Sequence, residues 1–96
     1  MRKKLRRAIV DDVTSQNIDD ELREELLDLF ESAMRSVSAT LVREATFNTS
    51  DFATAKKRGC EGFWLRVSRT RTDSGDSWFG AFTSGDQRLD VIGHLE

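Results

Sequence analysis

The stretch that decides the fold covers residues 63–93, FWLRVSRTRTDSGDSWFGAFTSGDQRLDVIG. Apolar and polar residues alternate in it with a period of two, as in Phe63, Leu65 and Val67, which is the pattern of half-buried strands. Two glycine-containing segments, 73–76 and 84–87, interrupt the alternation, and both are typical of tight turns. The sequence therefore predicts a three-stranded antiparallel meander over residues 63–93.

The two turns also predict which side chains share a face of this sheet. If each turn is a two-residue loop, Val67 lies opposite Phe82, and Phe82 lies opposite Leu89. One face then carries Leu65, Val67, Trp78, Phe82, Leu89 and Val91. The other face carries Trp64, Arg66, Phe79, Ala81 and Ile92. A one-residue slip at either turn would exchange the two faces.

Two helices are predicted before the meander. Apolar residues recur at steps of three and four over 19–45, which predicts a long amphipathic helix. They are Leu22, Leu26, Phe30, Ala33, Val37, Leu41 and Ala45. Asn17 or Asp19 can cap its start, and the acids after them suit the positive end of the helix dipole. A second, short helix is predicted over 50–58, with Ser50 as its cap and Gly59 as its terminator.

The N-terminal segment fits both a helix and a strand, because Leu5, Ile9 and Val13 are spaced by four and are all odd-numbered. A helix would place the cations of residues 1–7 at its positive end, so we prefer a strand that joins the sheet. The expected class is α+β, as one domain over residues 1–96. A long and a short helix pack on an antiparallel sheet of three strands, or of four with the N-terminal strand, in the order β-α-α-β-β-β.

Composition bounds the class of protein. The chain is 38% hydrophobic and 33% charged, has a net charge of -2, and contains no apolar run long enough to span a membrane. The basic N-terminus is not followed by the apolar region of a signal peptide. A single cysteine, Cys60, fits a reducing compartment. These features predict a cytoplasmic protein that does not insert into a membrane.

No catalytic or metal-binding pattern is recognisable. His94 is the only histidine, and one cysteine with one histidine does not make a metal-ligand set. Nothing in the sequence positions Cys60 and His94 as a nucleophile pair. The segment 59–62 lacks the length and the lysine of a phosphate-binding loop. We therefore expect a protein that is not an enzyme and needs no cofactor or metal.

Two binding surfaces follow from the predicted sheet. The first is a protein-binding face made by Trp64, Arg66, Phe79 and Ile92, because aromatic residues beside an arginine are typical of protein interfaces. A partner protein is the preferred ligand of this face. The N-terminal segment or the second helix could instead cover it, and self-association as a homodimer also stays open.

The alternative is a nucleic-acid interface that combines basic residues with exposed aromatics. Its candidates are Lys56, Lys57, Arg58, Arg66, Arg69 and Arg71. Exposed aromatic rings on a sheet stack bases, and arginines contact phosphates. The acidic pI of about 5.4 and the lack of a recognised nucleic-acid-binding motif weigh against this alternative.

Residues 59–70, GCEGFWLRVSRT, carry a family resemblance. The pattern Gly-x-Glu-Gly-apolar followed by Val-x-Arg-Thr resembles small podophage proteins that bind and inhibit the bacterial nucleoid protein H-NS. The basic start, Asp12-Val13-Thr14 and the acidic helix region are also similar. The pattern departs after Thr70, where the turn at 73–76 replaces a charged segment. The resemblance implies a phage-encoded regulator that sequesters a host protein.

Overall fold

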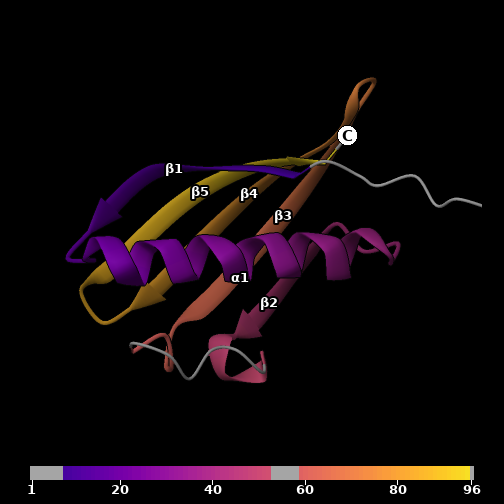
Figure 1. Ribbon diagram of the computed structural model, residues 1–96. Helices are drawn as coiled ribbons and strands as arrows, with labels where there is room; N and C mark the ends of the chain where they lie inside the picture. The colour runs from indigo at the N-terminus through magenta and orange to yellow at the C-terminus, as the bar shows by residue number, and fades with distance from the viewer. Residues whose placement is uncertain (1–7, 53–58, 96) are drawn as a thin grey trace, which may run out of the picture.

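The computed structural model describes residues 8–52 and 59–95, and these residues form one helix and one five-stranded antiparallel sheet (Figure 1). The order along the sheet is β1-β5-β4-β3-β2, and α1 lies across one face. The elements are β1 (Ala8–Gln16), α1 (Asp20–Ser38), β2 (Glu44–Asn48), the 3-10 helix η1 (Thr49–Asp51), β3 (Trp64–Thr72), β4 (Gly75–Ser84) and β5 (Gln87–Leu95).

The predicted order β-α-α-β-β-β with three or four strands is wrong. In the described residues one α-helix is followed by four strands, so the sheet has five. The N-terminal strand is present as β1, and the meander is present as β3, β4 and β5. The strand that the sequence prediction missed is β2, which begins within the last two residues of the predicted long helix and continues beyond it.

The helix predicted over 19–45 ends at Ser38. Residues 36–40 are Ser, Val, Ser, Ala and Thr, a run poor in strong helix formers. Ser38 and Thr40 donate side-chain hydrogen bonds to backbone carbonyls, Ser38 to Arg35 and Thr40 to Val37. These bonds compete with the helical pattern, so the chain leaves the helix and returns as β2.

The helix predicted over 50–58 is also wrong in the part that the structure describes. Residues 49–51 form a single 3-10 turn, and Phe52 is already extended with φ -95° and ψ 134°. The cap is Asn48, because its side-chain oxygen accepts from the Ser50 N–H and Asp51 accepts from the Asn48 N–H. Residues 53–58 lie outside the described part of the chain.

The register of β3 against β4 differs from the predicted one by two residues. Phe82 lies opposite Leu65, and Val67 lies opposite Gly80, because Asp73 and Ser74 alone make the turn. A shift of two residues preserves the faces, since side chains alternate with a period of two. Phe82 lies opposite Leu89, as the second turn predicts.

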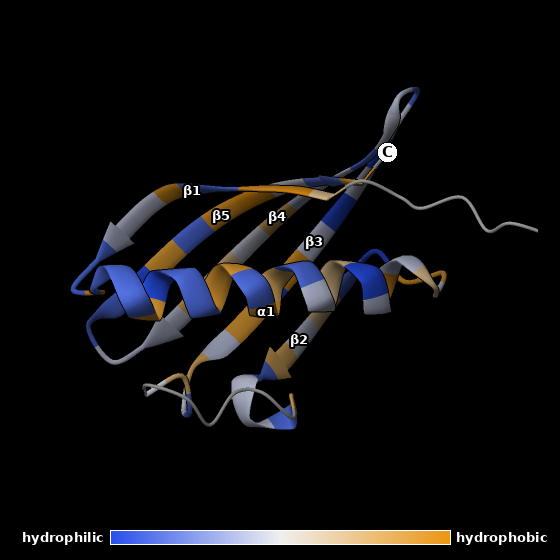
Figure 2. Ribbon diagram, in the orientation of Figure 1, coloured by the Kyte–Doolittle hydropathy of each residue, from blue (hydrophilic) through white to orange (hydrophobic). Residues whose placement is uncertain are grey.

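The core lies between α1 and the facing side of the sheet. Seven residues of α1 are buried: Leu22, Leu26, Leu29, Phe30, Ala33, Met34 and Val37. Figure 2 shows these apolar positions interrupted by hydrophilic ones around the helix, as an amphipathic helix requires. Asp19 is the N-cap of the helix, and its side chain accepts a hydrogen bond of 2.8 Å from the Leu22 N–H.

Two glycines allow the helix to approach the sheet closely. Gly80 and Gly93 lie on the core face of β4 and β5, directly beneath Phe30 and Met34. A Cβ atom on Gly80 would lie 2.2 Å from Cε1 of Phe30, and one on Gly93 would lie 2.4 Å from Sδ of Met34. Both distances are far below van der Waals contact, so the sheet is hollowed where these two side chains pack.

Candidate binding surface

The face of the sheet that points away from α1 carries the four predicted protein-binding residues. Phe79 lies opposite Ile92 on neighbouring strands, and Arg66 lies opposite Ala81. Trp64, Phe79 and Ile92 are 55, 44 and 47% exposed. No element within residues 8–52 and 59–95 packs over these side chains (Figure 1). The sequence candidates therefore lie together on one surface.

Strand β1 adds two apolar residues that were not among the predicted site residues. Ile9 and Val13 are about half exposed, and Ile9 lies opposite His94 on the same side as Ile92. Their odd-numbered spacing was the signal that could have found them, once β1 was placed beside β5. We call Ile9, Val13, Trp64, Arg66, Phe79 and Ile92 the open face.

The cations on this side of the sheet are already paired. The Arg66 guanidinium contacts Oε2 of Glu44 at 2.7 Å, and Arg88 contacts Oδ1 of Asp90 at 3.0 Å. Asp11, which lies opposite Ile92, has no ion-pair partner among the described residues. Phe79 and Ile92 therefore form an apolar pair on this side, the row next to them carries Arg66, Ala81 and Asp90, and Asp11 lies beside Ile92.

The nucleic-acid candidates do not form one surface. Arg66 lies on the open face, whereas Arg69 and Arg71 alternate with it and point to the side of the helix. Lys56, Lys57 and Arg58 lie outside the described residues. The described arginines are therefore divided between the two sides of the sheet. The exposed aromatic rings lie on the side of Arg66 alone.

Arg69 has a structural explanation of its own. Its side chain is 7% exposed, and its Nη2 donates to the carbonyls of Thr40 and Val42 at 3.2 and 2.7 Å. The guanidinium also lies 3.8 Å from Asp76 and 5.5 Å from the centre of the Trp78 ring. Arg69 thus fastens the loop after α1 to the sheet.

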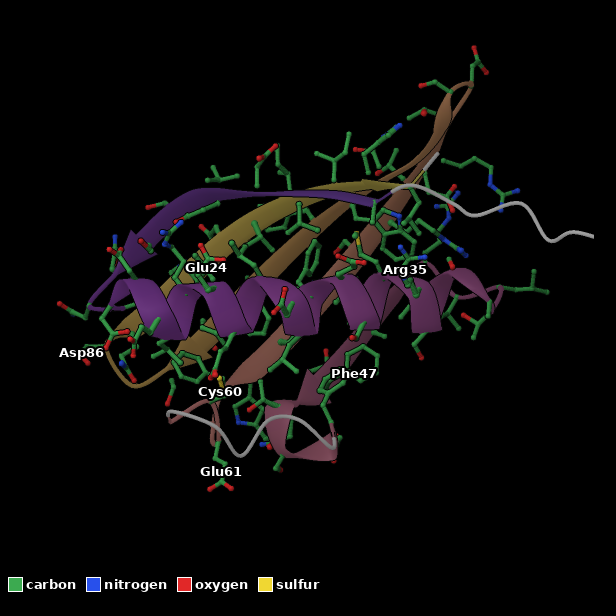
Figure 3. The ribbon with its side chains drawn as sticks, viewed as in Figure 1. Glu24, Arg35, Phe47, Cys60, Glu61 and Asp86 are labelled. Atoms are coloured by element: carbon green, nitrogen blue, oxygen red, sulfur yellow. The ribbon has the colours of Figure 1, made fainter. Side chains whose placement is uncertain are left out.

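Cys60 lies in the core under α1, and His94 lies on the other side of the sheet. Cys60 is buried beneath α1, and its thiol donates a hydrogen bond of 3.3 Å to Oε2 of Glu25. Figure 3 shows Cys60 on the side of α1 and the neighbouring Glu61 directed away from the molecule. His94 lies between Gly93 and Leu95, whose positions face the core, so its side chain points to the other side of the sheet.

The Cys60 thiol is expected to resist alkylation in the folded protein. Burial, followed by the hydrogen bond and the charge of Glu25, raises its pKa from 9.0 to about 12. The reactive thiolate is therefore scarce below that pH. Iodoacetamide labelling at pH 8, followed by mass spectrometry, should be slow in buffer and fast in urea. Equal rates in both conditions would contradict the buried placement.

The same shift predicts a dependence of stability on pH. Because the folded-state pKa is the higher one, the contribution of the neutral thiol is complete below about pH 9 and declines as the pH rises towards 12. Urea unfolding from pH 8 to pH 11 should show the stability difference between wild type and Cys60→Ala shrinking. The alanine variant removes the thiol and serves as the reference for all other alkaline titrations.

Metal and membrane signals are both missing from the described part of the chain. No group of three or more His, Cys, Asp or Glu side chains within residues 8–52 and 59–95 is arranged to hold a metal ion. The single described helix is not long and apolar enough to cross a membrane.

The structure is a small α+β fold in which, among the described residues, α1 covers one face of the sheet and no element covers the other. Comparison with protein-family models, curated proteins and solved structures gives no match to this chain.

Proposed function

We propose that this protein is a small non-enzymatic binding protein that modulates or inhibits a partner protein through the open face. The observation that carries the proposal is the gathering of Trp64, Phe79 and Ile92, each about half exposed, on one side of the sheet. Phe79 and Ile92 are direct neighbours on β4 and β5, and Trp64 lies further along the same face, beyond Arg66 and Ala81. Large apolar side chains exposed on one face are typical of protein interaction sites. Large aromatic side chains also supply most of the binding energy at such sites.

The charges around the open face indicate which kind of partner surface would be complementary to it. Arg66 and Arg88 are paired with carboxylates of the chain itself, so they need no acid from a partner. Asp11 is the charge that a partner must compensate, since a buried unpaired carboxylate is costly. The matching surface is therefore apolar and carries a lysine or an arginine opposite Asp11.

The resemblance of residues 59–70 to the podophage inhibitors gives this partner a class. It supports a phage-type regulator that acts in the cytoplasm of a host cell and sequesters a nucleoid protein of the H-NS type. Trp64 lies within that stretch of sequence and on the open face. One residue thus links the sequence pattern to the proposed contact.

The experiment is a titration of the protein with purified H-NS, followed by calorimetry at low and at high salt. Trp64→Ala should weaken binding by about 2 kcal/mol or more, since truncated aromatic anchors cost at least that much. Leu41→Ala is the matched control, because Leu41 is 96% exposed but lies in the loop after α1. A contact carried by apolar burial should persist at high salt.

Three results would contradict the proposal: no binding to H-NS, equal losses in Trp64→Ala and Leu41→Ala, or affinity that survives both changes. The alternative, a nucleic-acid-binding module, predicts a different outcome. Binding to an oligonucleotide would then fall steeply with salt, and Arg66→Gln would flatten that dependence. The two functions are therefore separated by the same set of variants.

A further inference from the structure

A second candidate site lies at the far end of α1. The loop after the helix and strand β3 enclose an open pocket of about 400 Å³, lined by Leu41, Arg43, Arg69, Thr70 and Arg71. Three of these five residues are arginines, and no carboxylate is among them. Apart from Arg69 and Arg71, none of its residues belongs to the candidate sites predicted from the sequence.

The three guanidinium groups differ in how many contacts they make with other groups of the chain. Arg69 is held in place by the carbonyls of Thr40 and Val42, so it forms a fixed wall of the pocket. Arg71 is 78% exposed, and its Nε lies 3.6 Å from Oδ1 of Asp76, a loose contact. Within residues 8–52 and 59–95, no carboxylate pairs with Arg43. Arg43 and Arg71 are therefore the groups available to a ligand.

The sheet adds a backbone donor at the same place. Strand β2 pairs with β3 only as far as Ser68, and the final bond runs from the Arg69 N–H to the Arg43 carbonyl at 2.8 Å. Backbone groups in antiparallel strands alternate between their two neighbours, so the Arg71 N–H points to the same edge as that of Arg69. At Arg71 the neighbouring strand β2 has already ended, and this N–H faces the pocket side.

The charge balance selects the kind of ligand. Arg43, Arg69 and Arg71 supply three positive charges, and within the part of the chain that the structure describes Asp76 is the one carboxylate that contacts any of them. The remaining double positive charge matches a phosphate monoester, which carries roughly -1.5 to -2 at neutral pH. Guanidinium groups also match the geometry of phosphate oxygens. Leu41, fully exposed at the rim, offers an apolar surface to the group that bears the phosphate.

We propose that this arginine pocket binds a phosphate monoester carried on an apolar or aromatic body. The phosphate lies between the Arg43 and Arg71 guanidiniums and accepts from the Arg71 N–H, and the apolar body covers Leu41. The site is independent of the open face and of the partner protein proposed above.

The experiment titrates the whole protein with phenyl phosphate and follows backbone amide shifts by NMR. Shifts should concentrate at residues 41–43 and 69–71, and Arg43→Gln should weaken binding about ten-fold, as expected for one charge-assisted contact. Arg88→Gln is the matched control, because it removes the same charge from the opposite end of the sheet. Among the described residues no carboxylate contacts the Arg43 guanidinium, so its replacement should leave the fold intact.

Two further ligands identify which part of the chemistry is recognised. Benzoate keeps the ring but carries one charge, so it should bind more weakly than phenyl phosphate. Inorganic phosphate keeps the charge but lacks the ring, and its affinity should not change in Leu41→Ala, whereas that of phenyl phosphate should fall. Equal losses in Arg43→Gln and Arg88→Gln, or shifts spread over the whole surface, would overturn the proposal.

The proposed phosphate site and the proposed protein-binding face can be tested separately. Arg43→Gln should leave H-NS binding unchanged, and Trp64→Ala should leave phenyl phosphate binding unchanged. Loss of both activities in either variant would show that the two surfaces are one site.

Discussion

Replacing Phe30 with alanine should lower the free energy of unfolding by about 3–5 kcal/mol, the usual cost of removing a buried phenyl ring. Phe30 is fully buried at the centre of α1, and its ring fills the hollow above Gly80 and Gly93. The neighbouring glycines have no side chains that could close the cavity. Since a small domain has a total stability of about 5–15 kcal/mol, much of the fold's stability depends on this ring.

Urea unfolding followed by circular dichroism measures this effect, and Phe79→Ala is its matched control. Phe79 is also a phenylalanine, but it lies on the open face and is nearly half exposed. Its removal should change stability by well under half of the Phe30 effect and should instead act on partner binding. Similar losses of stability in the two variants would mean that the open face is covered in solution.

A second large loss of stability is expected for Gly80→Ala, about 1–3 kcal/mol or more, because a methyl group is forced into a packed core. The added carbon would lie 2.2 and 2.6 Å from two atoms of the Phe30 ring and 3.0 Å from Val91. A buried ring cannot bend away as a flexible chain can. Gly93→Ala should cost less, because its closest neighbour is the flexible thioether of Met34 and the Phe30 ring lies farther from it, at 2.8 Å.

A double variant tests whether the loss arises from this contact. In a Gly80→Ala, Phe30→Leu protein the smaller side chain leaves room for the methyl group. The loss of stability in this double variant should therefore be smaller than the sum of the losses in the two single variants. Ala81→Val is the control for enlarging a neighbouring residue on the open face. Strict additivity of Gly80→Ala and Phe30→Leu would show that strain in β4, and not contact with α1, causes the loss.

The strands that alternate cleanly were predictable from the sequence. Over 63–93 the period of two fixes the faces of the sheet, and a register error of two residues leaves them unchanged. The membership of Trp64, Arg66, Phe79 and Ile92 in one face follows from that pattern alone. Each of the four residues belongs to a strand that a short turn connects to the next one.

The end of the helix and the position of β2 were not predictable in the same way. Leu41 and Ala45 continue the helical spacing of Val37 by chance, yet Leu41 is exposed and Ala45 faces the core from a strand. The segment 44–48 is short, and the alternation of Ala45 and Phe47 gives only two apolar positions in support of a strand. Only the pairing of β2 with β3, a tertiary interaction, decides between them.

The arginine pocket was not predictable because its residues come from separate parts of the chain. Arg69 and Arg71 stood out as part of a basic cluster, but Arg43 did not. Their meeting depends on the early end of α1, which brings the loop after the helix beside β3. Because the helix was predicted to be too long, the sequence did not point to Arg43. In the described part of the chain, Arg43 is the only arginine of the pocket that has no carboxylate partner.

The pairing of β1 with β5 has a consequence for the growing polypeptide. Ala8 lies opposite Leu95, so among the described strands the earliest in the chain pairs with the latest. Until these two strands pair, β1 exposes both backbone edges, and α1 covers an incomplete sheet. Joining such distant segments is slow because the loop between them must close first. On the ribosome the sheet therefore cannot be completed until residue 95 has left the exit tunnel, and the unpaired strand is open to other chains until then.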